Sequence, residues 1–113
     1  MADRRVYRRY AIWFPVVVVV GPNEIWAICR DASSGGFLAS AVTPIDVGVR
    51  VKARFRVTPS GPERTVAALV VREAANRDEL HLAFPYRVAL EFEQPIEDLV
   101  DELERYADTV QME

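Results

Sequence analysis

Residues 49–57 read VRVKARFRV, and this stretch decides the fold class. Apolar and cationic residues alternate along it without a break, which is the pattern of a β-strand with one buried and one solvated face. Its cations are Arg50, Lys52, Arg54 and Arg56. A solvated strand face is the simplest interpretation of these cations, and a surface for a partner or a nucleic acid is the alternative. Some of them are expected to meet the acids of the C-terminal helix.

Further strands are predicted on both sides of this one. Residues 11–20 (AIWFPVVVVV) are rich in β-branched residues and end at the turn Gly21-Pro22-Asn23, which favours a buried strand. The other predicted strands cover residues 24–30, 37–42, 64–72, 79–84 and 87–93. Short strands separated by frequent turns predict a mainly β domain, either a small barrel or a sandwich.

A helix is predicted after the last strand, over residues 95–110. Apolar residues recur there with helical spacing and form one stripe: Ile96, Leu99, Val100, Leu103, Tyr106, Ala107 and Val110. Pro95 suits the first helical turn, and Glu97 and Asp98 suit the positive end of the helix dipole. The stripe is expected to pack on the sheet and to cover an open side or end, with Glu102 exposed on the opposite face.

The whole chain, residues 1–113, is predicted to be a single domain. It comprises an arginine-rich N-terminal arm (1–10), a β region (11–93) and the C-terminal helix (95–110). The net charge is −3, yet four arginines gather in the arm while nine acids gather in residues 91–113. The arm therefore suits an anionic ligand. Nucleic acid is not the expected partner, because proteins that bind it are typically basic overall.

Several classes of site are excluded by composition. The chain has one cysteine, Cys29, and one histidine, His81, so it can build neither an internal disulfide nor a Cys/His metal site. Cys29 lies in an apolar strand and is expected in the core. No nucleophile–base pair is visible, so we predict neither an enzyme nor a cofactor. Pro15 and the valines after it favour a strand over a signal peptide or membrane span, which suits a soluble cytoplasmic protein.

Two short motifs carry the expected chemistry. The first is Arg5-Val-Tyr-Arg-Arg9, whose guanidinium groups suit phosphates and the O6/N7 edge of guanine. The second is Asp31-Ala-Ser33-Ser-Gly-Gly36, a polar loop in which a carboxylate and a hydroxyl lie beside glycines that let a ligand approach the backbone. Each motif also has a simpler interpretation. The arginines are typical of a solvated chain end, and the polar loop is typical of an Asx turn.

Taken together, the two motifs resemble those of the PilZ family. Pro15 stands six residues after Arg9, and the second motif follows about twenty residues after the first. The resemblance continues through Pro44, Val47-Gly48, residues 88–92 (VALEF) and the closing helix, and it covers roughly residues 4–108. It implies a six-stranded antiparallel β-barrel with one C-terminal α-helix, and it implies cyclic di-GMP as the ligand.

The resemblance also assigns roles to the motif residues. By it, Arg5 and Arg9 hold guanine edges and phosphates, Asp31 and Ser33 hold a guanine, and Gly36 shapes the loop. Arg4, just before the first motif, is the kind of residue that accompanies two stacked ligand molecules per chain instead of one.

Two departures from the family pattern stand out. Ala89 occupies a position that is often glycine, which alters local packing. Arg8 adds an arginine inside the first motif, so that Arg4 and Arg8 form a competing register for the motif pair.

The predicted function is that of a bacterial cyclic di-GMP receptor. It would relay the level of this second messenger to an unidentified effector protein, through an N-terminal arm that becomes ordered on binding, in motility or biofilm signalling. The alternative is a PilZ-like interaction adaptor in motility or surface machinery that does not bind the nucleotide.

Overall fold

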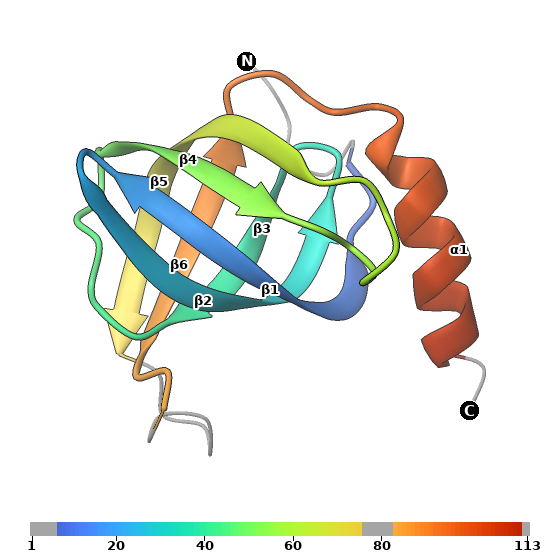
Figure 1. Ribbon diagram of the computed structural model, residues 1–113, viewed down its shortest axis with the longest axis horizontal. Coiled ribbons are helices and arrows are strands. Elements are labelled where there is room, and N and C mark those ends of the chain that lie inside the picture. Colours follow the sequence, from blue (N-terminus) through green and yellow to red (C-terminus); the bar gives the residue numbers. More distant parts are fainter. Residues whose placement is uncertain (1–6, 76–82, 112–113) are drawn as a thin grey trace.

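Six antiparallel strands close into a barrel, and one helix packs beside it (Figure 1). The computed structural model describes residues 7–75 and 83–111. The strands are β1 (Tyr10–Val20), β2 (Asn23–Ser33), β3 (Gly36–Ala41), β4 (Arg50–Phe55), β5 (Arg64–Ala75) and β6 (Tyr86–Phe92). They follow one another around the barrel in the order β1-β2-β3-β6-β5-β4, and β4 pairs back with β1. The predicted fold class, a mainly β six-stranded barrel with one C-terminal helix, is confirmed.

The alternating stretch around residues 49–57 forms β4 and closes the barrel. Val51, Ala53 and Phe55 are buried, as the period of two predicts. Ala53 lies opposite Val18 of β1, so two apolar faces meet where the first and last strands of the barrel join. Closure leaves no unpaired sheet edge at this seam.

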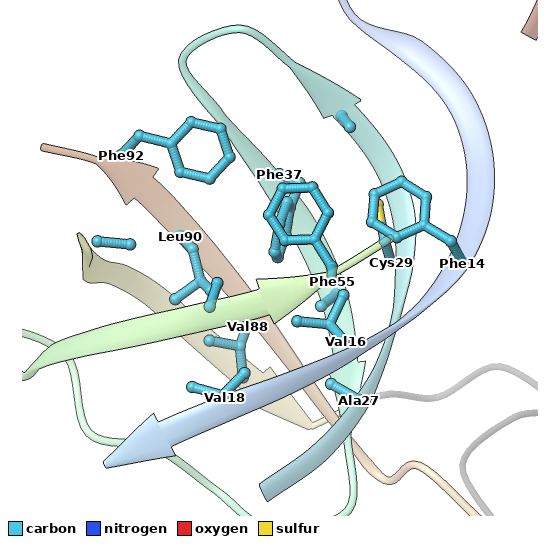
Figure 2. Close-up of a cluster of buried hydrophobic side chains, with 14 of the residues drawn as sticks. Phe14, Val16, Val18, Ala27, Cys29, Phe37, Phe55, Val88, Leu90 and Phe92 are labelled. Carbon is cyan, nitrogen blue, oxygen red and sulfur yellow. The ribbon is translucent and has the colours of Figure 1, made fainter. Parts of the chain in front are cut away.

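Four phenylalanines fill the barrel interior, and Figure 2 shows them converging from different strands. They are Phe14, Phe37, Phe55 and Phe92. The ring centroids of Phe14 and Phe55 lie 5.3 Å apart in a stacked arrangement, and Phe37 meets Phe55 edge to face at 5.4 Å. Burying each such ring contributes about 1.5–3 kcal/mol. Cys29 is fully buried beside them, which confirms its predicted place in the core.

The polar segment between β2 and β3 is a tight hairpin rather than the loop predicted from residues 31–36. Strand β2 runs to Ser33, β3 begins at Gly36, and only Ser34 and Gly35 form the turn. Ser33 itself braces this turn, because its Oγ accepts a hydrogen bond from the Gly35 amide (3.1 Å) and donates one to the Gly36 carbonyl (3.3 Å). Because its polar groups have local partners, Ser33 can lie within β2, although the polar composition of residues 31–36 predicted that the strand ends at residue 30.

The strand predicted over residues 79–84 is wrong in its final part. Residues 79–82, with His81, lie outside the described residues, and Ala83 and Phe84 are not in a strand. Strand β5 instead runs to Ala75, and β6 begins at Tyr86, directly after Pro85. A proline has no amide to donate to a strand ladder, so it marks the start of β6.

Helix α1 (Leu99–Gln111) begins later than predicted. The Leu99 and Val100 amides bond to the carbonyls of Ile96 and Glu97, an i to i+3 pattern that forms a tight turn before the helix. Pro95 therefore precedes the helix instead of opening it. Three residues of the predicted apolar stripe, Leu99, Leu103 and Ala107, are fully buried, whereas the side chain of Val110 lies outside the described residues. Within the described ranges, no helix is long and apolar enough to cross a membrane.

The helix packs near one end of the barrel, against β1 and β2, and ion pairs secure it. Arg64 of β5 pairs with Glu102 at 3.3 Å and with Asp98 at 3.4 Å. Glu102 was expected to be exposed, but only 15% of its side chain is accessible because Arg64 covers it. The cations of β4 pair elsewhere: Arg54 meets Glu24 and Glu63, and Arg50 meets Glu93. The expected contact between β4 and the helix acids was therefore wrong, since the acids that face β4 come from β2 and the loops.

Both tryptophans of the chain lie on the outer surface of the β1–β2 hairpin. Trp13 is 52% exposed and Trp26 is 60% exposed. The guanidinium of Arg30 lies 4.9 Å from the ring centroid of Trp13, in a cation–π arrangement. The outward positions of these strands thus carry large aromatic side chains that the core does not use.

Candidate functional site

A cavity of about 90 Å³ opens beside the β2–β3 hairpin, where the chain enters β1. Strands β3, β5 and β6 also contribute to its wall. Its polar and small lining residues are Tyr7, Arg9, Ser33, Gly35, Gly36, Arg72, Ala89 and Glu91. The guanidinium of Arg9, the braced hydroxyl of Ser33 and the glycine backbone therefore meet at one hollow.

Arg9 and Asp31, one from each sequence motif, form an ion pair at this cavity. The Arg9 Nε lies 2.9 Å from Asp31 Oδ1, and a terminal guanidinium nitrogen contacts the same oxygen. Half of the Arg9 side chain is exposed, so water screens the pair and its contribution to stability is small. Its effect is positional, because it holds the guanidinium beside the hairpin with further N–H donors directed to solvent.

The hairpin turn is fixed by the backbone of its neighbours. The Gly35 carbonyl accepts a hydrogen bond from the Phe92 amide at 2.9 Å, and the Ser34 carbonyl accepts one from the Ile96 amide at 2.8 Å. The end of β6 and the segment leading to α1 thus fix the turn through backbone hydrogen bonds. This arrangement presents Ser33 and Gly36 in one rigid geometry.

Two glycines of the hairpin, Gly35 in the turn and Gly36 at the start of β3, approach neighbouring atoms closely. A Cβ at Gly36 would lie 2.1 Å from the Leu90 carbonyl oxygen, which is backbone and cannot move aside. A Cβ at Gly35 would lie 2.7 Å from Cδ2 of Tyr7, whose ring covers the turn. Tyr7 therefore packs on the hairpin and brings Arg9, two residues later, to the cavity.

The structure places three of the six predicted site residues in the cavity lining, namely Arg9, Ser33 and Gly36, and it pairs a fourth, Asp31, with Arg9. The other two, Arg4 and Arg5, lie outside the described residues. Arg8 does not line the cavity, and its guanidinium lies 5.4 Å from the ring centroid of Tyr10. This position agrees with the choice of Arg9 over Arg8 as the second arginine of the motif.

Three polar lining residues were missed from the sequence: Tyr7, Arg72 and Glu91. Tyr7 lies within the arginine motif, and its aromatic character was the available signal. Arg72 and Glu91 are far from both motifs in sequence and reach the cavity only through the pairing of β5 with β6. No local pattern identifies residues of that kind.

Other site chemistry finds no support in the part of the chain that the structure describes. No group of three potential ligands among His, Cys, Asp and Glu comes together there to hold a metal ion. Burial raises the pKa of the Cys29 thiol well above its usual value, and the nearby Asp31 carboxylate raises it further. The thiol is therefore held in its protonated, unreactive form.

The fold and this cavity define a small closed barrel in which a polar hairpin and Arg9 lie beside one cavity. The chain belongs to the PilZ domain family, whose model matches residues 3–108. A search of curated proteins with the sequence finds no match.

Solved structures share the fold at low sequence identity. The PilZ domain of YcgR from Escherichia coli, solved with c-di-GMP, is 17% identical with a TM-score of 0.73, and the match covers 93% of this chain and 95% of that one. The Bacillus subtilis inhibitor of motility (MotI/DgrA) is also 17% identical with a TM-score of 0.73, and there 98% of this chain spans only 53% of the other. This chain is thus about half as long as that relative. At such identities the likeness concerns the fold alone.

Proposed function

We propose that this chain is a cyclic di-GMP receptor that relays the ligand signal to a partner protein. The observation that carries the proposal is that Arg9, Ser33 and Gly36 line one cavity of a PilZ barrel, while Asp31 is paired with Arg9. These residues come from the N-terminal arm and from both strands of the β2–β3 hairpin. Their chemistry matches a ligand with two guanines and two phosphates.

Each residue has a distinct part in the proposed binding. Arg9, together with Arg5, donates paired hydrogen bonds to phosphate or to the O6/N7 edge of guanine. Asp31 accepts hydrogen bonds from the N1 and N2 groups of a guanine, and Ser33 adds a hydroxyl. Gly36 keeps the hairpin backbone close to β6 and leaves the surface open to a planar base.

Relay to the partner is assigned to the N-terminal arm. Arg9 is half exposed and tied to the barrel by a single carboxylate, so a ligand held by Arg5 and Arg9 gives the arm further contacts. We propose that the effector protein recognises the ordered arm. A cytoplasmic location suits this role and the reduced state of Cys29.

The Arg9–Asp31 pair is also the observation that favours the second candidate, an adaptor that does not bind the nucleotide. The two charged motif residues already neutralise one another, so the site is satisfied without a ligand. Calorimetry with cyclic di-GMP separates the candidates. Heat with a defined endpoint supports the receptor, whereas no heat at high micromolar ligand supports the adaptor.

Arg9→Ala and Asp31→Ala are each expected to weaken cyclic di-GMP binding by about tenfold or more, because hydrogen bonds to charged groups contribute about 1.5–3 kcal/mol. Melting temperatures should change little, since the ion pair is exposed. Arg8→Ala is the matched control and should bind almost as the unchanged protein does. An Arg8→Ala variant weaker than Arg9→Ala would show that the motif register is wrong.

The expected stoichiometry is two ligand molecules per chain. Two stacked ligands bring four negative charges to the site, and Arg4 supplies a guanidinium beyond those of Arg5 and Arg9 to offset their repulsion. Arg4→Leu is expected to move the calorimetric ratio from two toward one. A titration of the unchanged protein that ends at one ligand per chain would contradict this stoichiometry and leave the receptor assignment intact.

A further inference from the structure

A second hollow adjoins the candidate site on the outer face of β5 and β6. Its volume is about 240 Å³, and it shares Arg72 and Ala89 with the first cavity. Leu38 of β3 lies opposite Ala89 and forms part of its apolar floor. The two hollows are thus one continuous surface that passes over the small side chain of Ala89.

A bulge in β5 places Arg72 on this surface. The register shifts between Val70 and Arg72, so that Val70 lies opposite Leu90 and Arg72 lies opposite Ala89. Without the extra residue, Val71 would lie opposite Ala89 and Arg72 would be turned toward the buried face of the strand. Bulges commonly redirect a side chain in this way beside binding sites.

Glu91 stands on the same face, two residues from Ala89 along β6, and it lines the first cavity together with Arg72. Neither Arg72 nor Glu91 forms an ion pair with any side chain that the structure describes, although other arginines of the barrel do. A guanidinium and a carboxylate therefore flank Ala89 with their hydrogen-bonding groups available.

The first cavity, lined by the motif residues Arg9, Ser33 and Gly36 and called the motif cavity below, is too small to hold the whole ligand. Pockets that enclose a drug-sized ligand have volumes of about 300–1,000 Å³. The motif cavity, at about 90 Å³, is far too small to enclose a cyclic dinucleotide. Part of the ligand must therefore lie outside it, and the hollow that shares Arg72 and Ala89 with the motif cavity offers both space and charge.

We propose that Arg72 and Glu91 form a second guanine subsite over Ala89, for the base that the motif cavity does not hold. The inference rests on the proposed cyclic di-GMP function. Arg72 donates two hydrogen bonds to O6 and N7 of the base, and Glu91 accepts from N1–H and the N2 amino group. Ala89 supplies an apolar contact for the ring. The subsite distinguishes guanine from adenine, because adenine lacks O6 and the N1 proton.

The test compares two ligands by calorimetry: cyclic di-GMP and the mixed cyclic dinucleotide with one guanine and one adenine. The unchanged protein should prefer cyclic di-GMP about tenfold or more. In Arg72→Ala and in Glu91→Gln this preference should fall toward one, because only the guanine contacts of the second subsite are lost. Arg50→Ala and Glu93→Gln are the matched controls, since these residues form an exposed ion pair outside both hollows and should leave the preference unchanged.

The outcomes separate the inference from the proposed function. If the unchanged protein binds cyclic di-GMP and Arg9→Ala weakens it, while Arg72→Ala and Glu91→Gln keep the full preference, the second subsite is wrong and the receptor stands. If the unchanged protein gives no heat with cyclic di-GMP, both are wrong. Thermal melting checks the fold of each variant, and Arg72→Lys, which keeps the charge but loses the paired donors, should show the same loss of preference if Arg72→Ala does not fold.

Discussion

Replacing Gly36 with alanine is expected to destabilise the barrel by about 3 kcal/mol or more and to abolish ligand binding. The added Cβ would lie 2.1 Å from the Leu90 carbonyl oxygen and 3.1 Å from Cα of Glu91, so β3 and β6 must separate locally. That separation displaces the hairpin carrying Ser33. Thermal melting should show a loss of at least about 10 °C, and calorimetry with cyclic di-GMP should show no heat.

Gly21→Ala is the matched control for this substitution. Gly21 has a φ of +58°, so alanine there is unfavourable by about 1–2 kcal/mol, yet no atom lies within 4 Å of the added Cβ. The control should lose a few degrees of stability and bind normally. Equal melting temperatures for the two variants would show that the Gly36 contact with β6 relaxes easily, contrary to the close packing described above.

Leu103→Asp is expected to unfold the protein or to release the helix from the barrel. Leu103 is fully buried between Leu99 and Ala107 on the face of α1 that packs against β1 and β2. An unpaired carboxylate at this position loses its hydration without gaining a partner, which costs several kcal/mol. Far-ultraviolet circular dichroism during heating should show a large decrease in melting temperature or aggregation.

Asp101→Ala provides the control on the same helix, because Asp101 is exposed. Glu102 does not serve this purpose, since it is largely covered and pairs with Arg64. If Leu103→Asp melts at the same temperature as Asp101→Ala, the helix contributes no packing energy and is an element for binding a partner instead.

Strand positions were predictable where apolar and polar residues alternate and one face of the strand is buried. The alternation around β4 and the apolar stripe of α1 both appear in the structure nearly as predicted. Strand ends were less predictable, because they depend on contacts made elsewhere. The turn at Ser33 and Gly36 is set by β6 and by the segment before α1, which no local pattern contains. The closed six-stranded barrel came from the resemblance to a family, since periodicity defines faces but not strand partners, and the pairing of β1 with β4 was not predicted.

The residues of the candidate site also differ in whether local sequence or strand pairing places them. Arg9, Asp31, Ser33 and Gly36 belong to short motifs, so their residue types and spacing pointed to them. Arg72 reaches the cavity through one extra residue in β5, and a one-residue shift of register is invisible in composition. The sequence therefore pointed to the candidate residues that lie in short motifs, and it did not point to those that reach the cavity only through strand pairing.

The two exposed tryptophans have a practical consequence for how this protein can be observed. Trp13 and Trp26 are the only indoles in the chain, and both already face solvent in the folded barrel. Their fluorescence emission should therefore lie at the long wavelengths of hydrated indole before any denaturant is added, and unfolding should shift it little. Iodide or acrylamide should quench the native protein efficiently. An emission change on adding a partner would report on the outer face of the β1–β2 hairpin, where the intrinsic fluorophores of the molecule are located.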